Sequence, residues 1–137
     1  VDALGGAPGV RSARYAGVGA TRQERDAANN AKLLDALRGV PPERRTARFV
    51  CAVCVAGHPE EKSERRSPTP TVLFEARGEF PGVIADAPRG VNGFGYDPLL
   101  LLPDGRTSAE LSPAEKNARS HRGAAVRAVA AWLRSSR

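Results

Sequence analysis

The sequence predicts an α/β protein in which helices flank a mixed β-sheet. Three observations favour this class: a helical pattern near the start of the chain, strand-sized apolar runs in its middle, and a capped helical segment near its end. The 137 residues, of which 41% are hydrophobic, are enough for one compact domain. We therefore expect residues 1–137 to lie in a single domain.

The first predicted element is a helix over residues 21–37, which follows a glycine-rich shaped loop over residues 1–19. Thr21 is a candidate N-cap, and Glu24 completes a capping box with it. An apolar stripe at helical spacing predicts the buried face of this helix. The stripe consists of Ala27, Ala31, Leu34 and Leu37.

Strands are expected in the middle of the chain. Residues 46–55 are largely apolar on both faces, which predicts a central strand. A second strand is expected over residues 71–78 and a short third over 83–85, whereas the charged segment 58–70 predicts a long hairpin loop. Residues 99–102 form the last predicted strand.

The C-terminal segment is predicted to be helical and interrupted. Ser112 is a candidate N-cap, Pro113 suits the first helical position, and Glu115 completes a second capping box. We expect a short helix, a break near Ser120, and a longer helix from about His121 that Ser120 caps. An apolar stripe predicts the buried face of the longer helix: Val126, Val129, Ala130 and Leu133.

Charge and cysteines restrict the class of partner and the compartment. The net charge of +6 suits a polyanion, either nucleic acid or a small phosphate ester, although a solvated basic surface gives the same value. Cys51 and Cys54 stand three apart in a strand, which sends their side chains to opposite faces. They are therefore expected to be free, buried thiols, as in the cytoplasm. No apolar run approaches the roughly 20 residues of a membrane helix.

The loop that ends in Gly93-Phe94-Gly95-Tyr96-Asp97-Pro98 is a candidate binding site. Glycines let a backbone approach a ligand closely, Phe94 could stack on a nucleobase, and Asp97 could accept hydrogen bonds from purine N–H groups. The alternative is a tight connection with Phe94 in the core, which loop chemistry alone favours.

A second candidate site lies at the predicted break near Ser120. The first N–H groups of a helix that starts there would face the same space as His121 and Arg122, which suits a carbonyl oxygen or a phosphate. The alternative, a solvated basic helix face, is the more common one for such a segment taken alone.

Taken together and in order, these segments closely resemble the inosine triphosphate pyrophosphatase family, over nearly the whole chain. The front end agrees, from Leu4-Gly5-Gly6-Ala7-Pro8-Gly9 to Ser12-Ala13-Arg14-Tyr15, and so does Asn29-Asn30 with Lys32-Leu33-Leu34. The later matching segments are Pro88 to Pro98, Thr107 to Leu111, Glu115-Lys116-Asn117 and Ser120-His121-Arg122-Gly123.

The resemblance implies a fold and an activity. The fold is a long mixed sheet with two lobes around a nucleotide cleft. The activity is hydrolysis of ITP, dITP and XTP between the α and β phosphates, which releases a monophosphate and pyrophosphate and cleanses the nucleotide pool. Mg²⁺ as cofactor, a homodimer and a cytoplasmic location are also implied.

The resemblance implies a role for each matching residue. Phe94 should stack on the purine, and Gly95, Tyr96 and Asp97 should line the same pocket. Lys116 should contact the nucleotide. His121 and Arg122 should recognise the 6-oxo edge of the base, since two donors there favour a carbonyl over the amino group of adenine.

Two motifs of that family have no match in this sequence: the phosphate-binding Thr-x-Asn-x-x-Lys loop, and the Asp-Asp-Ser-Gly motif that supplies the catalytic aspartate and metal ligands. The chain starts at Val1 and contains no methionine. We therefore expect it to be the C-terminal two-thirds of a longer protein, with neither catalytic nor metal-binding residues of its own. None of Asp2, Asp26, Asp35 and Asp86 has motif support.

The parent protein is accordingly expected to be an active pyrophosphatase, and the isolated chain to be nearly inactive and poorly folded because it lacks sheet strands. One alternative is an inactive fragment that binds nucleotide or supports dimerisation. The other is a basic nucleic-acid-binding module, which the sequence disfavours because only Phe94 and Tyr96 offer stacking in a basic loop.

Overall fold

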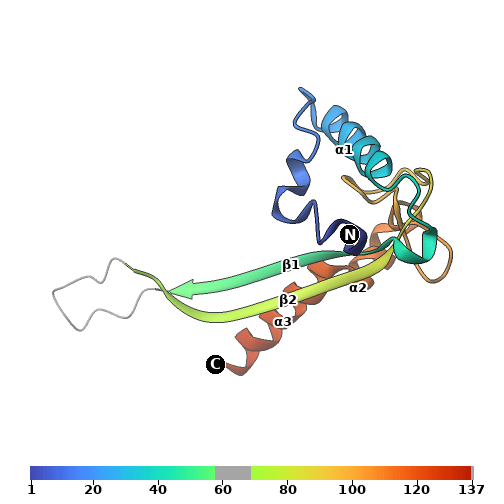
Figure 1. Cartoon of the computed structure of the whole chain (residues 1–137). Coiled ribbons are helices and arrows are strands. Elements are labelled where there is room, and N and C mark those ends of the chain that lie inside the picture. Colours follow the sequence, from blue (N-terminus) through green and yellow to red (C-terminus); the bar gives the residue numbers. More distant parts are fainter. Residues whose placement is uncertain (58–68, 137) are drawn as a thin grey trace. The chain divides into compact units, whose positions relative to one another are not determined.

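The computed structural model describes residues 1–57 and 69–136 (Figure 1). The predicted hairpin loop 58–70 therefore lies mostly outside the described residues. The chain forms two compact units. Unit 1 comprises Val1–Arg48 and Pro81–Lys116, and unit 2 comprises Phe49–Phe80 and Asn117–Arg137.

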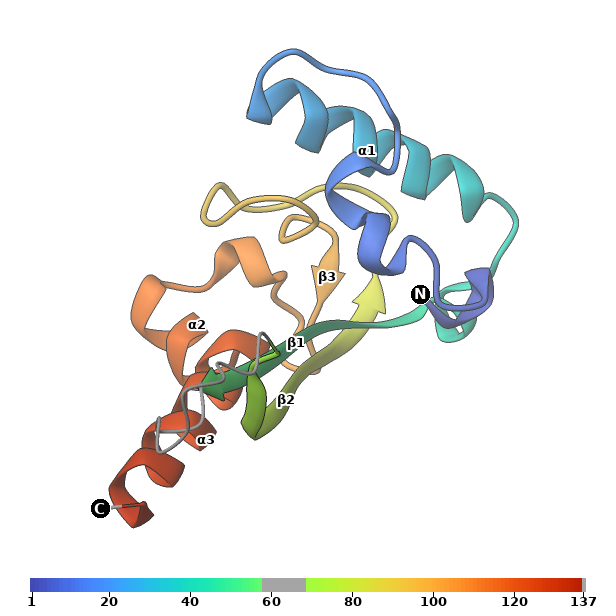
Figure 2. The same ribbon diagram turned by 90° about the vertical axis from the view of Figure 1, so that its left-hand side faces the viewer.

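The predicted α/β class is confirmed. Strands β1 (Thr46–Gly57), β2 (Thr71–Ile84) and β3 (Leu100–Leu101) form a sheet in the order β1-β2-β3. Strand β3 pairs with the end of β2 in antiparallel fashion, with Val83 opposite Leu101, and Figure 2 shows the two side by side. Three α-helices accompany the sheet in the described part of the chain: α1 (Arg22–Ala36), α2 (Pro113–Arg119) and α3 (His121–Ser135).

Two strand predictions were wrong. Strand β1 lies at the edge of the described sheet rather than in its centre, and Val50 in it is 43% exposed. The predicted third strand, residues 83–85, is the end of β2, which continues through Pro81. The backbone amide of Ile84 donates to the carbonyl oxygen of Arg45, the residue before β1. The backbone N–H and C=O groups of odd-numbered residues at this end of β2 therefore point away from β1. Pro81 thus points beyond the short β3 and removes no hydrogen bond of the sheet.

Helix α1 in unit 1 begins where the sequence predicts but buries a different face. The Thr21 hydroxyl accepts from the Glu24 amide at 3.2 Å, and the Glu24 carboxylate accepts from the Thr21 amide at 3.0 Å, as a capping box requires. The predicted stripe was right for Leu37, which is buried, and wrong for Ala27 and Ala31, which are exposed, while Leu34 is half-buried. Beside Leu37, the buried residues on this face are Asn29, Asn30 and Leu33.

The buried asparagines explain the rotated face of α1. Asn29 Oδ1 accepts from the Ala16 amide at 2.7 Å, so the side chain holds the preceding loop onto the helix. That loop, predicted as irregular, contains two 3₁₀ helices, η1 (Asp2–Leu4) and η2 (Gly9–Arg14). Polar groups that satisfy loop backbone can be buried as readily as leucine, which an apolar pattern does not reveal. The apolar core of unit 1 comprises Leu33, Leu37, Ala47, Ile84, Leu99, Leu100, Leu102, Ala109 and Leu111.

The interrupted C-terminal helix is confirmed. The Ser112 amide donates to the Glu115 carboxylate at 2.8 Å, and this bond, together with the Arg106 guanidinium, lowers the pKa of Glu115 to about 2. Helix α2 ends at Arg119, and the Ser120 hydroxyl accepts from the Gly123 amide at 3.1 Å to cap α3.

In unit 2, helix α3 packs along the β1–β2 hairpin through a face that the sequence did not predict (Figures 1 and 2). Val126 and Leu133 of the predicted stripe are 61% and 51% exposed, so the prediction was wrong for these two, whereas Val129 and Ala130 are half-buried. The contact face instead carries Ala125, which is fully buried, and Trp132, whose ring stacks on Phe74 at 5.2 Å. Aromatic and small residues thus decide the rotation of this helix.

Gly78 is where the hairpin and α3 approach most closely, and a substitution there is expected to destabilise unit 2. A Cβ at Gly78 would lie 2.0 Å from the His121 carbonyl oxygen, so backbone would have to move. We expect Gly78→Ala to lower the free energy of unfolding by about 1–3 kcal/mol, in a urea titration followed by far-UV circular dichroism. Gly57→Ala is the matched control, since its Cβ would meet only the flexible end of Leu73.

An equal loss of stability in both glycine variants would contradict the packing described for α3. The unmodified chain in the same titration also tests the expectation of poor folding. A cooperative unfolding transition would contradict that expectation.

Candidate functional site

The loop from Gly93 to Asp97 in unit 1 is held in one conformation by its own side chains. Gly93 and Gly95 have positive φ values of 82° and 62°, which other residues rarely adopt. A Cβ at Gly93 would lie 2.1 Å from Asp97 Oδ2, so only glycine lets the carboxylate fold back under the loop. Phe94, between the glycines, remains 41% exposed. The predicted alternative of a core phenylalanine therefore does not hold.

Asp97 is the centre of this loop. It is 3% exposed, and its Oδ2 accepts from the Phe94 amide at 2.8 Å and forms an ion pair with Lys116. Its Oδ1 accepts from the Ser108 hydroxyl at 2.9 Å. Three of the roughly four acceptor positions of the carboxylate are thus occupied. The main task of Asp97 in this structure is to fix the loop and to hold the ammonium group of Lys116.

Lys116 and Phe94 are brought together, although 22 positions separate them in the sequence. The Lys116 Nζ lies 5.5 Å from the centroid of the Phe94 ring. Its side chain is 17% exposed. A half-exposed aromatic ring beside a partly buried ammonium group can stack on a planar ring and attract an anionic group attached to it.

Tyr96 and Gly95 attach the loop to the rest of unit 1. The Tyr96 hydroxyl donates to the Ser12 carbonyl oxygen of η2 at 2.7 Å, and burial raises the pKa of Tyr96 to about 12. The Gly95 amide donates to Asp26 Oδ2 at 2.8 Å, and its carbonyl accepts from Asn30 Nδ2 at 3.1 Å. Tyr96 therefore stays protonated at neutral pH, and its hydroxyl links the loop to η2.

Sequence reasoning missed the residues of α1 that contact this loop. Asp26 had no motif to support it, and Asn30 was noted only as part of a family segment. A signal was nevertheless present, because Arg22, Asp26 and Asn30 stand four apart and so share one helix face. Such a polar stripe next to the buried face of a helix indicates that its side chains contact the backbone of a neighbouring loop.

His121 and Arg122 lie at the start of α3 in unit 2. The His121 ring is half-buried, 5.2 Å from the Phe49 ring at an interplanar angle of 32°, whereas Arg122 is exposed. The break before them is tight, since a Cβ at Gly123 would lie 2.1 Å from the Asn117 carbonyl oxygen. The predicted site residues thus form two groups, one in each unit.

Comparison with known proteins identifies the family. The sequence profile described as the Ham1 family matches residues 1–132. The chain belongs to the Ham1 family. The resemblance inferred from the sequence motifs is thereby confirmed, and the matched range includes both groups of predicted site residues.

Ham1 relatives of known sequence are similar to nearly all of this chain. A dITP/XTP pyrophosphatase of Yersinia pseudotuberculosis is 49% identical over 137 residues, which are 99% of this chain and 63% of that protein. One of Geobacillus kaustophilus is 54% identical over 127 residues, 92% of this chain and 55% of that protein. This chain therefore spans less than two-thirds of the length of these relatives.

Solved Ham1 structures share the fold. The Ham1 protein of Staphylococcus aureus superposes with a TM-score of 0.81 at 38% identity, over 100% of this chain and 63% of that one. The HAM1 protein of Coxiella burnetii gives a TM-score of 0.77 at 42% identity, over 98% and 62%. At these identities the likeness covers both units of this member of the family.

Within the part of this Ham1 chain that the structure describes, the carboxylates do not form a metal centre. Over residues 1–57 and 69–136, no three His, Cys, Asp or Glu side chains gather into a group that could hold a metal ion. Asp2 is bound by the Thr46 hydroxyl at 2.8 Å and by Arg48, while Asp26 is bound to the loop. A hard cation such as Mg²⁺ requires several oxygen ligands in one place, so the described residues do not fit it.

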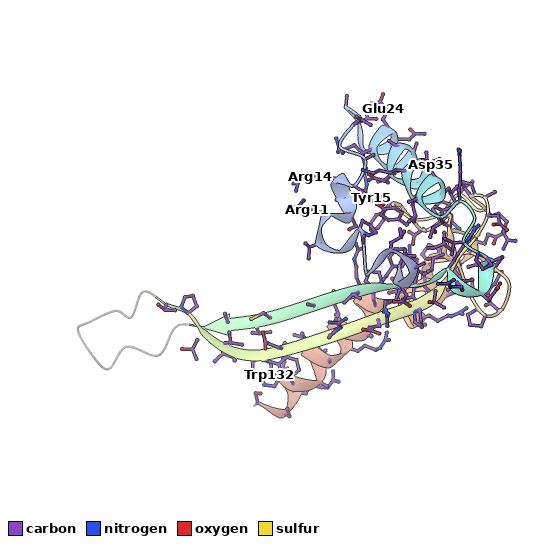
Figure 3. The ribbon with its side chains drawn as sticks, viewed as in Figure 1. Arg11, Arg14, Tyr15, Glu24, Asp35 and Trp132 are labelled. Atoms are coloured by element: carbon purple, nitrogen blue, oxygen red, sulfur yellow. The ribbon has the colours of Figure 1, made fainter. Side chains whose placement is uncertain are left out.

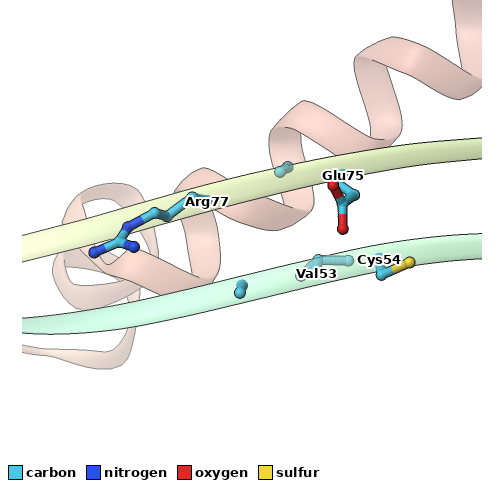
Figure 4. A pocket seen from close by; sticks show the side chains of 6 residues that line it. Val53, Cys54, Glu75 and Arg77 are labelled. Carbon is cyan, nitrogen blue, oxygen red and sulfur yellow. The ribbon is translucent and has the colours of Figure 1, made fainter. Parts of the chain in front are cut away.

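Two other features of the described surface involve no predicted site residue. Arg11 and Arg14 project to the same side of η2 in Figure 3. A hollow of about 370 Å³ runs along the hairpin in unit 2 (Figure 4). Its lining consists of Ala52, Val53, Cys54, Glu75, Ala76 and Arg77.

Both cysteines are free, as predicted, but neither is buried: Cys51 is half-buried, and Cys54, on the outer face of β1, is exposed. None of the helices in the described ranges combines the length and the apolar character needed to cross a bilayer.

Proposed function

We propose that this chain is the base-recognition part of a pyrophosphatase that acts on ITP, dITP and XTP. In the proposed reaction, water attacks a purine nucleoside triphosphate and the bond between its α and β phosphates breaks. The products are the nucleoside monophosphate, pyrophosphate and a proton. The names of the relatives support this proposal over a nucleic-acid-binding module.

The exposed ring of Phe94 on a fixed loop carries the proposal. Four groups hold the loop around it, namely Asp97, Tyr96, Asp26 and Asn30, yet the ring itself is 41% exposed. A large apolar ring that is both ordered and exposed in a polar setting is typical of a stacking platform. Phe94 stacks on the purine, and Gly95, Tyr96 and Asp97 form the wall and floor beside it.

Charge and hydrogen-bond donors supply the specificity. Lys116, oriented by Asp97, contacts the nucleotide next to the stacked base. His121 and Arg122 donate to the 6-oxo group of the purine. An adenine amino group would leave these donors unpaired, and unpaired donors in a site disfavour the wrong base.

Hydrolysis itself is assigned to the whole protein. A nucleotide pyrophosphatase is generally expected to use a divalent metal ion, and we propose Mg²⁺. The described carboxylates do not fit a metal ion. We therefore propose that the metal ligands and the water-activating aspartate belong to the part of the relatives that this chain does not match. A homodimer and a cytoplasmic location complete the proposal, the latter supported by the two free cysteines.

A turnover assay and a binding assay on the full chain test the proposal together. We expect inosine 5′-monophosphate to bind in isothermal titration calorimetry. We also expect almost no release of pyrophosphate from ITP with Mg²⁺. Robust turnover would contradict the assignment of catalysis to residues outside this chain. If inosine 5′-monophosphate does not bind, and the chain causes a salt-dependent mobility shift of DNA or RNA, the nucleic-acid-binding module would be favoured instead.

Arg122→Gln is expected to weaken discrimination between 6-oxo and 6-amino purines. The ratio of the affinities for ITP and ATP should fall by about tenfold, because one charged donor to the 6-oxo group is lost. Calorimetry with both nucleotides measures the ratio. Arg134→Gln removes the same charge from the last turn of α3 and should leave the ratio unchanged. If the two variants have the same ratio of ITP and ATP affinities, Arg122 does not take part in base recognition.

A further inference from the structure

Helix α1 presents three polar side chains to the loop that carries Phe94. Arg22, Asp26 and Asn30 lie at four-residue intervals, so they form one stripe along the helix axis. All three contact the loop from unit 1, and each contacts a different group of it. Asn30 belongs to a segment that resembles the family, but none of the three residues is among the expected base contacts.

Asp26 and Asn30 hold both polar backbone groups of Gly95. Asp26 Oδ2 accepts from the Gly95 amide at 2.8 Å, and Asn30 Nδ2 donates to the Gly95 carbonyl at 3.1 Å. Gly95 has a φ of 62°, a conformation that a free glycine leaves easily. The two hydrogen bonds restrict it from both sides. Asn30 is 9% exposed, so water does not compete freely for its bond.

Arg22 acts on the ring itself. Its guanidinium carbon lies 4.4 Å from the centroid of the Phe94 ring, within the range of a cation–π contact. A ring has two faces, and the guanidinium covers one of them. A base that stacks on that face would have to displace Arg22, so Arg22 restricts how a base can approach the ring.

We propose that Arg22, Asp26 and Asn30 are positioning residues that fix Phe94 in its stacking orientation without contacting the base. The inference rests on the proposed function, in which Phe94 stacks on a purine. A loop that is already ordered in the free protein loses less conformational entropy when the ligand binds. If the loop populates its stacking conformation only part of the time, the apparent affinity falls by the same fraction.

Asp26→Ala tests the proposal most sharply, with Asp35→Ala as its matched control. Both changes remove an aspartate from α1, but Asp35, labelled in Figure 3, forms a surface ion pair with exposed Arg38 at 2.9 Å and, within the described residues, makes no hydrogen bond or ion pair with the loop. We expect Asp26→Ala to weaken the binding of inosine 5′-monophosphate by about tenfold, and Asp35→Ala to change it less than about twofold. Asp26→Asn keeps an acceptor oxygen and should restore part of the affinity.

A second measurement reports on the loop without ligand. Hydrogen exchange of the Gly95 amide, followed by NMR, should be faster in Asp26→Ala than in the unmodified chain. If Asp26→Ala unfolds, Arg22→Gln replaces it, because the Arg22 side chain is 65% exposed and is not part of the core. Its expected loss of affinity is about threefold. Arg38→Gln, with an 83% exposed side chain, is its control.

The outcomes separate the two proposals. Faster exchange at Gly95 with an unchanged affinity for inosine 5′-monophosphate would overturn the positioning role and leave the proposed function intact. Failure of the unmodified chain to bind this nucleotide would instead overturn the proposed function. Weaker binding in Asp26→Ala, partial restoration in Asp26→Asn and no change in Asp35→Ala would support the positioning role.

Discussion

Replacement of Asp97 by asparagine is expected to lower the free energy of unfolding by about 2–4 kcal/mol, because it leaves a partly buried ammonium group without its counter-ion. The Asp97 side chain is 4% exposed and that of Lys116 is 17% exposed. The same carboxylate also accepts from Phe94 and Ser108, so these bonds weaken together. Few other polar side chains of unit 1 hold as many groups.

A urea titration that compares Asp97→Asn with Asp35→Asn checks this expectation. Asp35 is an exposed member of a surface pair with Arg38, and such pairs contribute about 1 kcal/mol at most. Similar midpoints for the two variants would mean that the Asp97–Lys116 pair is not a structural centre. The floor of the candidate site would then have to be explained in another way.

Replacement of Phe94 by alanine is expected to remove most of the affinity for inosine nucleotides. Stacking of a base on an aromatic side chain contributes about 1–3 kcal/mol, so the Kd for inosine 5′-monophosphate should rise by about 5- to 150-fold. Stability should change little, because the ring is 41% exposed and takes no part in the core. Calorimetry and a urea titration on the same sample separate these two effects.

Val91→Ala is the control for Phe94→Ala, since Val91 lies in the same loop and is 96% exposed. It should leave both the affinity and the stability unchanged. A Phe94→Ala variant that binds as tightly as Val91→Ala would show that the ring does not stack on the base. A large loss of stability would instead show that Phe94 is a core residue.

Capping residues were the part of the fold that the sequence predicted best. Thr21, Ser112 and Ser120 begin their helices as expected, because a cap depends on residues within one helical turn. The chemistry of these positions is local, so the break before His121 was predictable. It places that side chain and Arg122 at the first turn of α3.

The buried faces of the helices were predicted poorly, because they depend on partners elsewhere in the chain. Asn30 is buried on α1 since Gly95 offers it a carbonyl, and Ala125 is buried on α3 since Gly78 leaves room for it. In both cases a glycine far away in the sequence decides the contact. An apolar pattern contains no information about such partners.

The sequence proposed the residues of the candidate site but not the hydrogen bonds that hold them in place. The resemblance named Phe94 and Lys116, and unit 1 brings them within 5.5 Å. It did not predict that the Asp97 carboxylate is occupied, nor that Asp26 supports the loop. Both facts concern contacts between residues far apart in the sequence or with loop backbone, which are set by the tertiary fold and not by residue type.

A crystal structure of the full chain with inosine 5′-monophosphate would test the central claim most directly. We expect the hypoxanthine ring to lie parallel to the Phe94 ring, with its oxygen in hydrogen-bond range of both His121 and Arg122. A nucleotide bound away from this ring, or one whose base oxygen meets neither donor, would contradict the proposed mode of base recognition.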